Sequence, residues 1–224
     1  MSRSENHKPR SASRRKGDLS RRDEFLSAAL RRFSRYGFST TSTREICADV
    51  GLAHSAVYNY FPSKESMLLA IEEREMTAMQ AGLDAVLETV GDRPPLERLE
   101  LAIRFTFKIA VDKREAWRLM AEMLRSLKPR HRGPVIARRD RYEQTLRLQI
   151  AAAVAAGDVP QQDISLSSLY LFGIAESLAG WFRPDGRLSA DQLVDHATGF
   201  VMMAIKAGQA EAVGLQSARS QLMM

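Results

Sequence analysis

Polar and aromatic side chains that could contact a ligand are concentrated in residues 40–61, which read TTSTREICADVGLAHSAVYNYF. Ser42 and Glu45 have the spacing of a capping box, which satisfies the free N–H groups at the start of a helix. Gly51 supplies the positive φ that a tight turn needs, and a second short helix would turn Val57 inward. The outward positions of that helix are His54, Ser55, Ala56, Tyr58, Asn59 and Tyr60. Such groups suit base edges and phosphates, so the segment predicts a helix-turn-helix that contacts nucleic acid.

Catalytic patterns are absent from the sequence. The four histidines, His7, His54, His131 and His196, are scattered, and there is no HExxH, GxSxG, P-loop or dinucleotide-binding glycine pattern in its proper context. A helical enzyme is therefore the weakest hypothesis, and we expect no cofactor and no metal site. The lone Cys47 cannot form an intrachain disulfide or build a zinc site by itself. It is interpreted as a small packed side chain, with a redox sensor as the alternative.

The charge is concentrated at the N-terminus. Residues 1–22 carry eight Lys or Arg against two Asp or Glu, which accounts for the whole formal net charge of +6. A basic arm on a neutral body favours a polyanionic partner, with a solubilising tail as the alternative. Residues 1–18 are rich in Ser, Arg and Lys and have little apolar surface, so they are predicted to be a disordered arm.

The rest of the sequence predicts an all-α protein, because apolar side chains recur at helical spacing and no alternating strand pattern occurs. Turn residues such as Gly91–Pro95, Lys128-Pro129, Gly133-Pro134, Gly157–Pro160 and Arg183–Gly186 separate the elements. The expected helices are 20–36, 43–50, 54–60, 63–90, 95–111, 113–127, 133–156, 163–182 and 189–208. The expected domains are a three-helix DNA-binding domain over 19–66, a helical effector-binding and dimerisation domain over 67–208, and a flexible tail over 209–224.

Residues 20–70 resemble the TetR family of transcriptional regulators. The resemblance rests on helix 20–36, Gly37-Phe38, Thr41-Ser42, Ile46, Gly51-Leu52, Val57-Tyr58, Tyr60-Phe61, Ser63-Lys64-Glu65 and Leu68. Beyond residue 70 only the general helical architecture is similar. Two positions depart from the family pattern: Ala53 stands where Ser or Thr often caps the recognition helix, and Cys47 stands where Ala is usual. Neither departure removes a group that faces DNA.

The resemblance implies a role for each matching residue. His54, Ser55 and Ala56 would face bases in the major groove. Thr43, Arg44, Tyr58 and Tyr60 would contact phosphates, and Lys64 would contact the DNA backbone. Asn59 could pair with adenine or be a solvated helix residue. Phosphate contacts set the register on the duplex, while base contacts set the sequence.

The later helices are expected to hold an effector pocket and a dimer interface. Large apolar side chains and nearby arginines suggest the pocket lining Phe105, Phe107, Trp117, Met120, Met123, Arg118 and Arg141, with Arg104 as a further cation. Ordinary core packing explains the apolar members of this set equally well. Helices 163–182 and 189–208 are apolar over wide faces and would pair with a second copy in a four-helix bundle, unless a monomer buries them internally.

No segment is long and apolar enough to span a membrane, so we expect a cytoplasmic protein. The apolar faces of helices 163–182 and 189–208 predict a homodimer. The TetR resemblance implies a repressor that binds double-stranded DNA at a palindromic operator and is released by a small-molecule effector. The alternative is a ligand-independent DNA-binding or nucleoid protein whose C-terminal domain only dimerises.

Overall fold

The computed structural model describes residues 10–208 of the chain, with side chains from residue 20 onward. Every regular element in this range is helical, which confirms the predicted all-α fold. The chain divides into two compact units after Ile71, five residues beyond the predicted boundary. We refer to the described residues up to Ile71 as the first unit and to those from Glu72 onward as the second unit.

The first unit contains α1 (Arg10–Tyr36), α2 (Thr43–Val50), the short 3₁₀ helix η1 (His54–Asn59) and the start of α3 (Lys64–Val90). One face of α1 buries Phe25, Leu26 and Phe33, and α2 and η1 contribute Ile46 and Val57 to the same core. The ring centroids of Phe33 and Phe38 lie 5.2 Å apart in an edge-to-face arrangement. This apolar centre fixes the positions of the two short elements whose outer surfaces remain in solvent.

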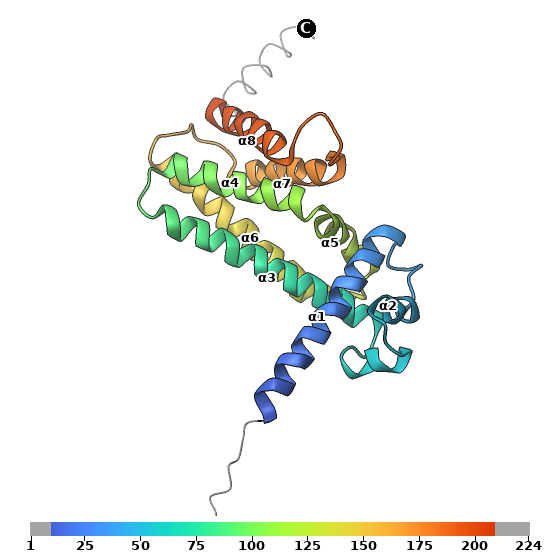
Figure 1. Ribbon diagram of the computed structural model, residues 1–224. Coiled ribbons are helices and arrows are strands. Elements are labelled where there is room, and N and C mark those ends of the chain that lie inside the picture. Colours follow the sequence, from blue (N-terminus) through green and yellow to red (C-terminus); the bar gives the residue numbers. More distant parts are fainter. Residues whose placement is uncertain (1–9, 209–224) are drawn as a thin grey trace, which may run out of the picture. The chain divides into compact units, whose positions relative to one another are not determined.

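The second unit contains the remainder of α3 and five further helices, α4 (Pro95–Asp112), α5 (Arg114–Ser126), α6 (Pro129–Ala155), α7 (Ile164–Trp181) and α8 (Ala190–Ala207). Helix α4 packs against α6, α7 and α8, and Figure 1 shows it running between α6 and the α7–α8 pair. Its fully buried face includes Leu99, Ile103, Phe107 and Ala110, as its helical periodicity predicts. The core of this unit is therefore organised around α4.

Three helices differ from the sequence-based expectation. Helix α1 begins at Arg10, ten residues before the predicted start, so residues 10–18 of the expected disordered arm are helical; Arg, Lys and Ala favour helix even without an apolar face. The recognition segment is a 3₁₀ helix, and Ala53 at its N-cap provides no side-chain hydrogen bond. Helix α6 passes through the predicted break at Gly133-Pro134, because it begins at Pro129 and its apolar face continues on the far side of Pro134.

The remaining helix boundaries agree with the prediction to within one or two residues. Helix α2 has the predicted bounds, and Gly51 adopts the expected left-handed φ of 71°; Gly37, after α1, is also left-handed at 89°. Residues 1–9 of the arm and the tail 209–224 lie outside the described residues. Over the described range, no helix has the length and hydrophobicity needed to cross a membrane.

Candidate DNA interface and effector cavity

The capping residues predicted for α2 form the expected geometry. The Ser42 hydroxyl accepts a hydrogen bond from the Glu45 amide, and the Glu45 carboxylate accepts one from the Ser42 amide at 2.7 Å. Gly51 ends the helix in the left-handed conformation, which costs a residue without Cβ least. Helix α2 and η1 are thus joined by a turn of fixed geometry, as a helix-turn-helix requires.

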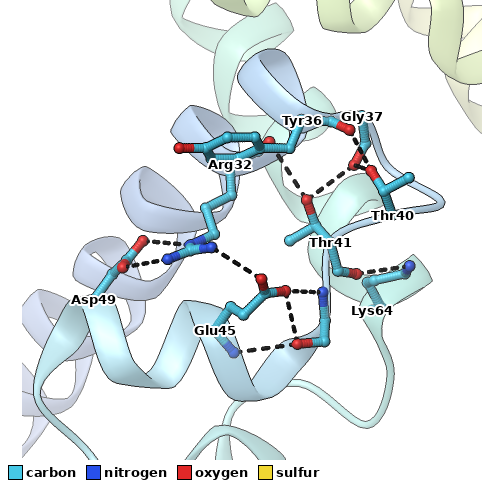
Figure 2. A network of polar contacts seen from close by, with 9 residues as sticks. Arg32, Tyr36, Gly37, Thr40, Thr41, Glu45, Asp49 and Lys64 are labelled. Carbon is cyan, nitrogen blue, oxygen red and sulfur yellow. Dashed lines mark hydrogen bonds and ion pairs between the residues drawn. The ribbon is translucent and has the colours of Figure 1, made fainter.

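An arginine of α1 fastens α2 in place. The Arg32 guanidinium donates to both carboxylate oxygens of Asp49, at 2.6 and 2.8 Å, and lies 3.3 Å from a carboxylate oxygen of Glu45 (Figure 2). This pairing lowers the pKa of Asp49, and the hydrogen bonds from Ser42 lower the pKa of Glu45. A bidentate pair of this kind sets orientation as well as distance. Sequence analysis missed it because 17 residues separate its two partners in the chain.

Lys64 has a different environment from the one expected. Its ammonium donates to the backbone carbonyls of Phe38, Ser39 and Thr41, at 2.6, 3.3 and 2.9 Å, and lies 4.5 Å from the centre of the Phe38 ring. Burial lowers the pKa of this amine. An ammonium has three protons to donate, and here each has a carbonyl acceptor. Lys64 therefore ties α3 to the turn before α2, and the expected contact with the DNA backbone is not supported.

The outer surface of the helix-turn-helix contains a small polar cluster. The His54 Nε2 atom lies 2.9 Å from the Thr43 hydroxyl and 3.4 Å from the Tyr58 hydroxyl. The His54 and Tyr58 rings meet edge to face with centroids 5.3 Å apart. Residues from the start of α2 and from η1 therefore fix the imidazole jointly, and the structure brings these three predicted DNA contacts together.

The other predicted DNA contacts differ in exposure. Arg44, Ser55 and Asn59 are exposed, whereas Ala56 and Tyr60 are half-buried. The Tyr60 ring packs 5.5 Å from the Phe25 ring, so only part of this side chain faces solvent. Cys47 is buried beneath this surface with its thiol facing the His54 carbonyl, and burial raises the pKa of the thiol. These features support the packing interpretation of Cys47, because a redox sensor needs an exposed, acidic thiol.

A cavity of about 290 Å³ lies within the second unit, between α3, α5, α6 and α7. Its wall is mostly apolar or aromatic, with three charged side chains. The lining residues are Met76, Met79, Trp117, Met120, Ala121, Arg139, Tyr142, Glu143, Leu169, Phe172 and Glu176. A concave, largely apolar site with a few polar groups is the usual form of a small-molecule site.

Two of the seven predicted lining residues, Trp117 and Met120, lie in this cavity. Phe107 and Met123 are buried in the core, Phe105 packs against Gly82, and Arg118 and Arg141 are exposed to solvent. Arg104 instead pairs with Asp195 of α8. The five misplaced lining residues have one cause. Helical spacing indicates which side chains turn inward, but not which of these border an empty space. Met76 and Met79 of α3 were missed for the same reason.

The charged groups of the cavity differ in their partners. The Glu143 carboxylate accepts hydrogen bonds from Arg147 at 2.6 Å and from Ser168 at 2.8 Å. Arg139 donates to the backbone carbonyl of Met120, and burial lowers the pKa of its guanidinium. Glu176 is exposed at the edge of the cavity. The hydroxyl of Tyr142 is 3.0 Å from that of Thr106, and burial raises the pKa of the tyrosine.

Helices α7 and α8 expose large apolar side chains in the isolated chain. Five of these residues are more than 60% exposed: Leu169, Tyr170, Trp181, Phe200 and Met203. Gly173, Gly180 and Gly199 have open space where a Cβ would stand, so another backbone could approach closely there. Among residues 20–208, nothing in the chain buries these faces, which argues against the monomeric alternative.

Both units match known protein families. The family described as bacterial regulatory proteins, tetR family, matches residues 25–71, and the tetracyclin repressor-like C-terminal domain matches residues 92–205. The transcriptional repressor KstR2 of Mycolicibacterium smegmatis is 25% identical over 195 residues, which cover 86% of this chain and 94% of KstR2.

Solved structures agree with this assignment at the level of the fold. A tetR-family regulatory protein from Rhodococcus RHA1 superposes with a TM-score of 0.76 at 24% identity, over 83% of this chain and 96% of that one. AibR in complex with isovaleryl coenzyme A and operator DNA gives a TM-score of 0.74 at 24% identity, over 83% and 98% of the two chains. Both matched regions and the helix-turn-helix geometry lead to one conclusion: this chain belongs to the TetR family of bacterial regulatory proteins.

Proposed function

We propose that this protein is a cytoplasmic, dimeric transcriptional repressor that binds a palindromic operator and leaves it when a small molecule fills the cavity of the second unit. The observation that carries this proposal is the outer surface of α2 and η1, where His54, Thr43 and Tyr58 form a fixed polar cluster above a buried apolar base. A purely structural helix corner has no need of such a surface. KstR2, which this chain resembles over nearly its whole length, is a transcriptional repressor.

The DNA contacts divide into two kinds. His54, Ser55 and Ala56 would read base edges, with Asn59 as a further candidate; Ser55 and Asn59 are exposed on the recognition element, and His54 and Ala56 are half-buried there. Thr43, Arg44, Tyr58 and the exposed part of Tyr60 would contact phosphates and set the register. Lys64 and Arg32 would act as positioning residues, since their contacts are to the protein itself.

Dimerisation would occur through α7 and α8. Their exposed aromatic and methionine side chains, together with the open glycine positions, offer a surface for a four-helix bundle with a second copy. A two-fold dimer carries two recognition elements, which read half-sites about one helical turn of DNA apart. An effector in the cavity would favour a dimer state in which this spacing is wrong. AibR, whose fold is similar, has been solved with both a small molecule and operator DNA bound.

The experiment is selection of bound duplexes from a random DNA pool by the purified protein at physiological salt. We expect one palindromic motif. A Met203→Glu variant should lose the dimer and recover no palindrome, because it places a charge in the proposed interface. Gln144→Glu, which adds the same charge at an exposed position of α6, is the matched control and should behave as wild type. Weak, salt-sensitive binding without a motif would instead identify a nonspecific DNA-binding protein.

A further inference from the structure

One charged side chain in the cavity wall, Arg139, has no charged partner of its own. No carboxylate among the described residues lies within ion-pair distance of its guanidinium, which donates instead to the carbonyl of Met120. The side chain is partly withdrawn from water. A cation in this position retains part of the cost of its lost hydration, because Glu72 and Glu176 attract it only from beyond ion-pair distance.

The nearby carboxylates of Glu72 and Glu176 attract this guanidinium from a distance, but neither forms an ion pair with it, and burial still lowers its pKa. Glu143 is engaged by Arg147 and Ser168, and the buried Glu72 is paired with the neighbouring Arg138 at 2.9 Å. Glu176 is exposed, so water and salt screen its attraction for Arg139. Arg139 is therefore the one charged residue of the cavity lining that is partly buried and has no ion-pair partner among the described residues.

The remainder of the wall defines the body of the ligand. Met76, Met79, Met120, Trp117 and Phe172 present apolar and polarisable surface, and the Tyr142 hydroxyl is already engaged with Thr106. The cavity volume of about 290 Å³ is near the lower end of small-molecule sites. Such a space suits a small, mainly apolar molecule with few polar groups.

We infer that the cavity binds a compact ligand with an apolar body and one anionic group, such as a carboxylate, which pairs with Arg139. This inference rests on the proposed function, in which the cavity is the effector site, and it names the class of effector. Arg139 takes the role that the sequence suggested for Arg104, Arg118 or Arg141. A guanidinium and a carboxylate match in geometry and can form two parallel hydrogen bonds.

The test uses three probes that share one apolar body and differ in charge: phenylbutyrate, phenylbutyramide and phenylbutylammonium. Trp117 lines the cavity, and Trp181, the second tryptophan, is exposed on α7, so a Trp181→Phe background assigns the fluorescence change to the cavity. We expect phenylbutyrate to bind at least roughly tenfold more tightly than the amide, since hydrogen bonds to charged groups are the stronger ones. The ammonium should bind most weakly.

Two arginine variants of α6 provide the control. Arg139→Gln should abolish the preference for the anion and leave binding of the amide unchanged, whereas Arg141→Gln, which alters an exposed neighbour, should preserve it. Equal or tighter binding of the amide or the ammonium, an anion preference that survives Arg139→Gln, or no binding of any probe overturns the inference. Selection of DNA by the protein with both tryptophans intact separates the two proposals, because a recovered palindrome leaves the proposed function intact whatever the probes show.

Discussion

The two units use their carboxylates in opposite ways. In the first unit, Asp49 and Glu45 stand near solvent, and contacts with Arg32 and Ser42 lower their pKa values. In the second unit, Glu72 is fully buried; burial raises its pKa despite the pairing with Arg138, and its Oε1 has no hydrogen-bond partner among the described residues. The charges of Asp49 and Glu45 orient α2 at the surface of the first unit, whereas burial disfavours the charged form of Glu72 in the second.

This contrast follows from what each unit must present. The helix-turn-helix presents a polar outer surface for DNA, so its small apolar centre is supplemented by helix caps, one bidentate ion pair and the ammonium of Lys64. The second unit contains a cavity, so its stability depends on the apolar core around α4, while a few of its charged groups line the cavity. Variants of the first unit should therefore mainly weaken DNA binding, and core variants of the second unit should mainly lower the free energy of unfolding.

The largest effect is expected in the core of the second unit. Phe107→Ala should lower the free energy of unfolding by about 3–5 kcal/mol, because it removes a fully buried ring and leaves a void. Urea unfolding followed by tryptophan fluorescence measures this loss. Ile136→Ala, at an exposed apolar position of α6, is the control and should change stability little. Similar losses in both variants would mean that α4 is not the centre of this core.

The next effect is expected at Lys64. Lys64→Met keeps the aliphatic stem and removes three hydrogen bonds from an ammonium to carbonyls; a hydrogen bond to a charged group is worth about 1.5–3 kcal/mol. We expect weaker DNA binding on every sequence, because the turn before α2 loses its anchor. The salt dependence of binding should stay unchanged, since no phosphate contact is lost.

Measurement of the DNA dissociation constant over a range of salt concentrations decides between the two roles of Lys64. A lysine that contacts phosphate contributes about one unit to the slope of log affinity against log salt, so its removal reduces the slope. Arg44→Met gives the comparison, because this exposed arginine is expected to contact phosphate. A reduced slope for Lys64→Met would show that Lys64 contacts a DNA phosphate and would reject the anchoring role.

The sequence predicted the first unit better than the cavity, and the physical reason is the range of the contacts. Ser42, Glu45 and Gly51 act within a few residues, so their spacing alone fixes the α2 boundaries. The Lys64 contacts cross 23 to 26 residues of sequence. The cavity joins side chains from four helices, and only Trp117 and Met120 of the predicted lining reach it. Helical periodicity marks an inward face, but the shape of an unfilled space depends on how several faces meet.

A smaller effect comes from the two capping boxes, one in each unit. Ser42 and Glu45 cap α2, and Ser189 and Gln192 cap α8 in the same way. Ser42→Ala and Ser189→Ala should each cost about 1 kcal/mol of stability. Only Ser42→Ala should also weaken DNA binding, because α2 positions the recognition element. Equal effects of the two variants on DNA affinity would show that the cap of α2 acts through general stability alone.

The smallest effect is a dependence on pH that should have opposite signs in the two units. The lowered pKa values of Asp49 and Glu45 stabilise the first unit above the unfolded pKa values of these groups, and this contribution is lost as the pH falls through their folded values. Glu72 has a raised pKa, so its contribution is present below the ordinary glutamate pKa of about 4.3 and is lost as the pH rises through its folded value.

Glu72→Gln should therefore gain stability relative to wild type as the pH rises from the ordinary glutamate pKa, because the variant carries no buried charge to desolvate. Urea unfolding at a series of pH values from acid to neutral measures the difference, and both tryptophans report on the second unit. Glu75→Gln is the control, since Glu75 lies on the same helix and is paired with Lys113 at 3.0 Å. A constant difference between wild type and Glu72→Gln across this range would mean that Arg138 compensates the burial of Glu72 fully, and the contrast between the two units would disappear.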